Sequence, residues 1–275
     1  MTIVDANRPA AKRFDRRSLL PWITTPLLVA LLIAVWQAYV QGSQISAFIL
    51  PTPGAVWSAW LDLLASPRAW GHAATTVYET VIGFAWGLVI GVGLGVLIGR
   101  IAWLERTLNP FIVAIQVVPK VAFVPLFVVW FGFGIFPKVI CAFMLGFFPV
   151  VVSTVMGFKS VEPDMIDLAR SMKASRLATF MRISLPQALP SIFAGLKVSV
   201  TLAVVGAVVG EFVGSNSGIG YLLQIANGNF DLPLMFAALT VLSLVGVTLF
   251  AAVDLVERLM IPWHASQRND FSATA

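Results

Sequence analysis

Long apolar runs alternate with short polar segments along most of the chain. Each run is close to the length of about 20 residues that an α-helix needs to cross the hydrocarbon core of a bilayer. We therefore expect an all-α membrane protein built as one bundle of six transmembrane helices. The predicted helices cover residues 19–40, 75–99, 109–131, 138–157, 191–214 and 233–256.

The polar stretch over residues 158–190, between the fourth and fifth runs, predicts a short amphipathic helix outside the bilayer. Pro163 and Asp164 are typical of a helix start with acid in its first turn. The apolar positions that follow are spaced i, i+3, i+4 and i+7, so they form one stripe on a helix. They are Met165, Leu168, Ala169 and Met172. Pro186 ends the pattern.

The segments outside the runs complete the domain organisation. Residues 1–18 carry five basic residues and predict a basic cytoplasmic arm. The first run could be a signal peptide, but it is long for one and lacks an evident cleavage site. We interpret residues 19–74 as a retained first helix and an outer interfacial segment, with a short helix near residues 56–64. Residues 75–258 form the transmembrane domain, with either a short helix or a re-entrant turn expected near 219–226, and residues 259–275 form a cytoplasmic tail.

Composition and charge agree with this organisation. The 275 residues are 59% hydrophobic and only 11% charged, whereas soluble domains carry about 25% charged residues. The net charge of +5 fits basic loops held on the cytoplasmic side of a membrane better than it fits nucleic-acid binding. The basic residues gather in the arm, two loops and the tail, which predicts that both termini lie inside. Cys141 is the only cysteine, so we expect no disulfide framework, no metal site and no cofactor.

Glycines recur every fourth residue in two of the runs. Such rows let helix backbones approach closely in a membrane, where little hydrophobic force drives helices together. We expect both rows to pack against other helices, in this chain or in a partner chain. The residues are Gly83, Gly87, Gly91 and Gly95 in the second run, and Gly206 and Gly210 in the fifth.

Two charged residues inside the runs are candidates for a translocation path. Lys120 lies midway along the third run, which prolines interrupt, and Glu211 lies near the outer end of the fifth. A charge at a helix centre costs roughly 2.5–3.5 kcal/mol on insertion scales, so it usually faces the bundle interior or water. Lys120 would attract an anionic solute. The alternative is a structural ion pair or a hydrogen-bonded anchor between helices. We expect Glu79 and Asp254 to lie near the membrane surfaces without a role.

The polar stretch resembles the EAA loop of permeases from ABC importers. The matching positions are Asp167-Leu168-Ala169, Lys173, Ile183, Leu185 and Pro186. Asp167 and Leu168 replace the usual Glu and Ala, and Lys173 stands where the family usually has Gly. Flanking segments, among them residues 118–120, 130–134 and 210–212, are similar to the permease group for nitrate, sulfonates, taurine, and pyrimidine and riboflavin precursors.

The resemblance implies a function and a set of partners. The amphipathic helix would be a coupling helix that rests on a cytoplasmic ABC ATPase subunit, which binds the ATP. An extracytoplasmic binding protein would deliver a small solute to a homodimer of this chain in the inner cell membrane. The coupling residues would be Asp167, Leu168, Ala169, Met172, Lys173, Ile183, Leu185 and Pro186. The alternative is an ordinary amphipathic helix on the membrane surface.

Lys173 qualifies this resemblance, because glycine allows a positive φ or a close backbone approach and lysine adopts neither easily. We expect either a gentler bend after the helix, or an ion pair between Lys173 and acid on the ATPase.

Two other classes of protein fit the sequence less well. A self-sufficient secondary transporter or channel often shows repeated halves, but the proline-broken third run has no equal in the other half. A membrane enzyme would need a cluster of titratable residues. The chain has two distant histidines and no G-x-x-x-x-G-K-[ST] phosphate loop, so we expect no ATP hydrolysis by this chain. The sequence does not identify the solute.

Overall fold

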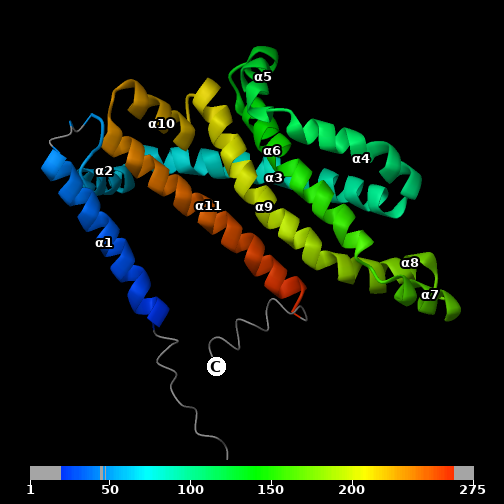
Figure 1. Ribbon diagram of the computed structural model, residues 1–275. Helices are drawn as coiled ribbons and strands as arrows, with labels where there is room; N and C mark the ends of the chain where they lie inside the picture. Colours follow the sequence, from blue (N-terminus) through cyan, green and yellow to red (C-terminus); the bar gives the residue numbers. More distant parts are fainter. Residues whose placement is uncertain (1–19, 44–45, 47, 263–275) are drawn as a thin grey trace, which may run out of the picture. The chain divides into compact units, whose positions relative to one another are not determined.

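The computed structural model describes residues 20–43, 46 and 48–262, and all regular secondary structure in these ranges is helical (Figure 1). Five helices are long and apolar enough to cross a membrane, and a bent pair of helices makes a sixth candidate. The predicted all-α membrane fold is confirmed. The predicted basic arm and the last 13 residues of the predicted tail lie outside the described residues.

The chain divides into two units, residues 1–45 with 265–275 and residues 46–264. In the first unit, α1 (Leu20–Ser43) corresponds to the first predicted membrane helix. All the elements that follow belong to the second unit.

Three long helices form the centre of the second unit. They are α3 (Pro67–Arg100), α6 (Ile135–Lys159) and α9 (Leu185–Gly214), and α6 packs along both of the others (Figure 1). The glycine rows of α3 and α9 both face α6 of the same chain. A Cβ atom on Gly83 would come within 2.5 Å of the Ala142 Cβ, and one on Gly206 within 2.5 Å of the Cys141 carbonyl oxygen. The two contacts therefore require glycine.

The third predicted membrane helix is the bent pair. Its first part, α4 (Ala102–Val117), starts seven residues before the predicted bound and accommodates Pro110. The second part comprises a short 3-10 turn, η2 (Lys120–Phe123), and α5 (Val124–Phe131). The two parts meet at 75°. The bend lies at Pro119, because proline has no N–H to continue the hydrogen-bond ladder.

The polar stretch over residues 158–190 forms one short helix followed by the start of a long one. α7 (Pro163–Ser171) is the predicted amphipathic helix. From α8 (Arg176–Thr179) the helical run continues through a π turn, η3 (Phe180–Ser184), into α9. The prediction that Pro186 ends the helical pattern was wrong, because the run continues through it. Just before Pro186, the Leu185 N–H donates to the Phe180 carbonyl in a wider π turn. Such a turn is one of the distortions that let a helix contain a proline.

The remaining helices pack on one another and on the central helices. α2 (Pro53–Ala65) and α10 (Ile219–Gly228) are the short helices predicted in the two outer segments. Both pack against α11 (Leu232–Met260), which also packs against α9.

Candidate functional site

The apolar stripe of α7 is divided between two environments. Met165, Leu168 and Met172 are 41%, 58% and 74% exposed, whereas Ala169 is only 6% exposed and turns toward its own chain. The three exposed side chains give α7 an apolar face, Met165–Leu168–Met172, with no cover among the described residues. Water disfavours such a surface, and contiguous exposed apolar groups commonly mark a site of protein or membrane interaction.

Lys173 ends α7 in the left-handed conformation, with φ of 56°. The Ala174 N–H donates to the Ala169 carbonyl and the Lys173 N–H to the Arg170 carbonyl, each at 2.9 Å. These two bonds form the Schellman motif, in which glycine usually holds the left-handed position. The expectation of a gentler bend was therefore wrong. Lysine adopts the glycine conformation at a cost of roughly 1–2 kcal/mol.

The other residues of the EAA-like motif lie at separate places. Asp167 is exposed, and one of its oxygens is 2.9 Å from Nη1 of Arg170 on the next turn. Ile183 lies in the π turn and Leu185 begins α9, where Leu185 packs against a buried apolar cluster that includes Phe158 and Ile192. The structure thus brings Asp167, Leu168 and Met172 together on α7. Ile183, Leu185 and Pro186 belong to the helix that follows.

Lys120 lies at the bend of the third membrane helix and lines an open pocket of about 330 Å³. Gln116, Phe148 and Ser153 also line it. The Lys120 Nζ donates to the Gln116 carbonyl at 3.2 Å and lies 4.9 Å from the centre of the Phe148 ring. No carboxylate of the described residues pairs with it. An ammonium group beside an aromatic face and an amide can bind an anionic or a planar polar molecule.

Glu211 is fully buried and hydrogen-bonded. The Thr76 hydroxyl donates to its Oε1 at 2.7 Å and the Gly220 N–H donates to its Oε2 at 2.6 Å. Thr76 also accepts a bond from the Ile219 N–H at 2.8 Å. The carboxylate therefore holds the first turn of α10, where a negative charge is favoured by the helix dipole. These contacts are those of the hydrogen-bonded anchor rather than of a residue exposed on a path.

A buried ion pair lies at the same end of the bundle. Oε1 of Glu79 on α3 is 2.6 Å from Nζ of Lys138 on α6, and both side chains are at most 5% exposed. The Lys138 Nζ also donates to the Ser215 hydroxyl at 2.9 Å. The sequence indicates no role for Glu79, whereas in the structure its carboxylate fixes α3 to α6. We call Thr76, Glu79, Lys138 and Glu211 the buried polar cluster.

Asp254 also has a partner that the sequence did not reveal. The Nζ of Lys197 on α9 is 2.5 Å from carboxylate oxygens of both Asp254 and Glu257 on α11. Arg258 contacts Asp254 at 2.8 Å from the next turn of α11. The expectation of a solvated Asp254 without a role was wrong, since these ion pairs join α9 to α11. The available signal was a lysine in the middle of an apolar run, which needs a counter-charge from another helix.

Comparisons with known proteins give a consistent result. Residues 87–262 match the family described as "Binding-protein-dependent transport system inner membrane component". The chain is 39% identical to the riboflavin transport system permease protein RibX of Chloroflexus aurantiacus, over 90% of this chain and 92% of that protein. It is 36% identical to the formylaminopyrimidine transport permease protein ThiX of Halalkalibacterium halodurans, over 88% and 96% of the two chains.

Two further comparisons extend this picture. A putative aliphatic sulfonates transport permease protein, SsuC of Bacillus subtilis, is 32% identical over 94% of each chain. Among solved structures, an inward-facing crystal form of the MetNI methionine ABC transporter superposes with a TM-score of 0.60. That match has 20% sequence identity and covers 71% of this chain and 98% of the other, so it shows a shared fold.

Proposed function

The chain belongs to the family of binding-protein-dependent transport system inner membrane components, and from that membership we propose that it is the permease subunit of an ABC importer in the inner cell membrane. A separate ATPase subunit binds and hydrolyses the ATP, and an extracytoplasmic binding protein delivers the solute. Two copies of the chain form the transporter. This chain supplies the path and the lever, and is not itself an enzyme.

The one structural observation that supports this proposal beyond family membership is the exposed apolar face of α7. α7 is short and carries both polar and apolar side chains, and Met165, Leu168 and Met172 face outward. This face suits a groove on a partner protein, because methionine side chains adapt to the shape of the surface they meet. We assign this face to the ATPase subunit. The alternative, a helix lying on lipid, would not need the folded connections that α7 makes to its neighbours.

Those connections explain how movement of α7 reaches the membrane helices. α6 ends at Lys159 and α7 begins at Pro163, so three residues join them. After α7, the Schellman turn leads within five residues of Ser171 to the start of the long helical run at Arg176. Since α6 and α9 pack along their length, a displacement of α7 by the ATPase is passed to both helices together. Alternating access follows from rocking of these packed helices around the path.

We place the solute path beside Lys120. Its ammonium group has no carboxylate partner among the described residues, and it lies in an open pocket with Gln116, Phe148 and Ser153. These groups suit a small anion or a planar heterocycle with hydrogen-bonding groups. The relatives are named for riboflavin, formylaminopyrimidine and aliphatic sulfonates, which have these chemistries. The buried polar cluster, Glu211 included, acts as an anchor between helices in this proposal.

The α7 assignment is tested by co-purification. Leu168→Asp and Met172→Asp place a charge on exposed side chains, so the chain still folds. Burial of one such side chain in a partner is worth roughly 1.5–3 kcal/mol, and each variant should bind the ATPase at least about tenfold more weakly. Leu259→Asp is the matched control, because Leu259 is also 74% exposed but belongs to the last turn of α11 rather than to α7. Equal recovery of the ATPase with all three variants would contradict the assignment.

A further inference from the structure

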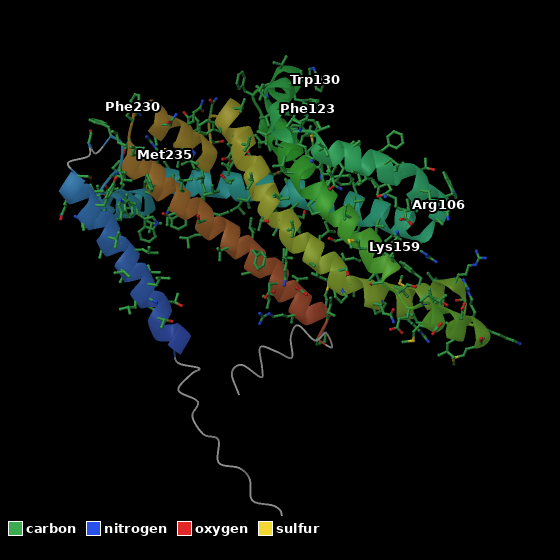
Figure 2. The ribbon with its side chains drawn as sticks, in the orientation of Figure 1. Arg106, Phe123, Trp130, Lys159, Phe230 and Met235 are labelled. Carbon is green, nitrogen blue, oxygen red and sulfur yellow. The ribbon has the colours of Figure 1, made fainter. Side chains whose placement is uncertain are left out.

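A polar pocket of about 640 Å³ lies where α7, α8 and the ends of the membrane helices meet. Arg100 comes from the end of α3, Phe158 from the end of α6, and Arg176 and Ser184 from the first turns of the run that becomes α9. Arg106 and Lys159 mark the same end of the bundle in Figure 2. The pocket therefore lies where α3 and α6 end and the long helical run into α9 begins.

The pocket is strongly basic. Three of its lining residues are arginines, Arg100, Arg170 and Arg176, and none of the lining residues is acidic. Nη1 of Arg170 also lies 2.9 Å from an oxygen of Asp167, and Asp167 does not line the pocket. The Arg100 guanidinium is held over the Phe180 ring, 4.8 Å from its centre. Three like charges around one cavity repel each other, so the pocket favours an anion that each guanidinium can bond.

The pocket lies on one side of α7, and the apolar face of α7 lies on the opposite side. Ile166 and Arg170 line the pocket, whereas Met165, Leu168 and Met172 are exposed. With 3.6 residues per turn, the centres of these two sets lie roughly 150° apart around the helix. A partner protein that covers the apolar face thus leaves the pocket-facing side of α7 free for a ligand.

We propose that this pocket binds a phosphate group, supplied by the headgroup of an anionic phospholipid. Arginine matches phosphate because its planar fork can donate two parallel hydrogen bonds. The Ser184 hydroxyl adds a polar group to the lining, and Phe158, Val161 and Phe180 provide apolar wall for the first carbons of a lipid. Basic pockets between membrane helices on the cytoplasmic side bind lipid headgroups in this manner. Free phosphate shares the same chemistry, and the experiment separates the two sources.

One consequence rests on the proposed function. A phosphate bonded to Arg170 on α7 and to Arg100 on α3 clamps the coupling helix to the membrane helices. The lipid would then stiffen the connection through which the ATPase moves the permease. The binding site itself does not depend on that function, because it needs only the full chain and the ligand.

The test titrates lipid into the purified full-length chain in a neutral detergent. The probe is dioctanoyl phosphatidylglycerol, with zwitterionic dioctanoyl phosphatidylcholine and inorganic phosphate as separate arms. The readout is the midpoint of thermal unfolding, followed by tryptophan fluorescence. The pocket variant is Arg100→Gln with Arg176→Gln. The control, Arg106→Gln with Arg182→Gln, removes the same charge from nearby residues that do not line the pocket. Arg176→Gln alone, on an exposed side chain, replaces the double variant if the latter does not fold.

Phosphatidylglycerol should raise the midpoint of the wild type and of the control alike. For the pocket variant the apparent affinity should fall by about tenfold or more for each arginine removed. If inorganic phosphate gives the same shift at the same concentration, the anion site stands and a soluble phosphate is its ligand. An equal response of the pocket variant and the control, or an equal effect of phosphatidylcholine, would overturn the proposal. ATP-driven uptake by the wild type tests the proposed function independently of this result.

Discussion

Removal of the Lys138 charge should destabilise the protein severely. Lys138→Met leaves Glu79 as a buried carboxylate without its cation, and breaking a buried pair in this way costs about 3–5 kcal/mol. The full value applies because the side chains of Lys138 and Glu79 are 5% and 0% exposed, so water cannot replace the lost partner. Glu79→Leu should cost a similar amount, since it leaves the ammonium group with only the Ser215 hydroxyl.

The double variant distinguishes an ion pair from two independent residues. Glu79→Leu with Lys138→Met removes both charges and keeps a similar side-chain volume, and such exchanges are often neutral. We therefore expect the double variant to be more stable than either single variant, with a coupling energy of about 3 kcal/mol or more. At about 2–4 °C for each kcal/mol in a chain of this size, each single variant should unfold roughly 10 °C below the wild type.

The assay is thermal unfolding in detergent or nanodiscs, followed by the fluorescence of the nine tryptophans. The wild type and the three variants are measured under one condition. Additive losses, with the double variant less stable than either single variant, would refute the reasoning, because they would show that the two charges do not compensate each other.

Three further predictions concern backbone contacts and the path. Gly83→Ala should lower the free energy of unfolding by about 1–3 kcal/mol, because the added Cβ would meet Ala142 on α6. Gly93→Ala, where no described atom lies within 4 Å of the added Cβ, should raise it by roughly 0.5–1 kcal/mol. Thermal unfolding compares the two variants. Lys173→Gly should gain up to about 1 kcal/mol by relieving the left-handed strain, and Lys173→Ala, which loses the charge but keeps the strain, should not. Lys120→Met should raise the KM of ATP-driven solute uptake at least about tenfold, and an unchanged KM would remove Lys120 from the path.

Hydrophobic patterning predicted the helices well, because each membrane helix must bury its own backbone bonds and so needs a continuous apolar run. The bounds were less accurate where proline occurs. α4 begins at Ala102 and passes through Pro110, whereas the run from Arg176 passes through Pro186 with a π turn. Neighbouring helices decide whether a proline bends a helix or is accommodated, and the local sequence does not contain that information.

The candidate site was predicted only where the local sequence determines the structure. The α7 helix and its apolar positions follow from local periodicity, but the burial of Ala169 depends on what packs behind it. The pairs Glu79–Lys138 and Lys197–Asp254 join residues 57 to 59 positions apart, which no local pattern indicates. Glu79 and Asp254 lie near helix ends in the sequence, and their roles appeared only when the partner helix was known.

The central claim is that a separate ATPase drives this chain through α7. The most direct measurement is solute uptake into proteoliposomes that contain the chain with or without the ATPase, with binding protein and solute outside and ATP inside. We predict uptake only when the ATPase is present, and loss of that uptake with Leu168→Asp but not with Leu259→Asp. Full uptake by the chain alone, or full ATP-driven uptake with Leu168→Asp, would contradict the claim.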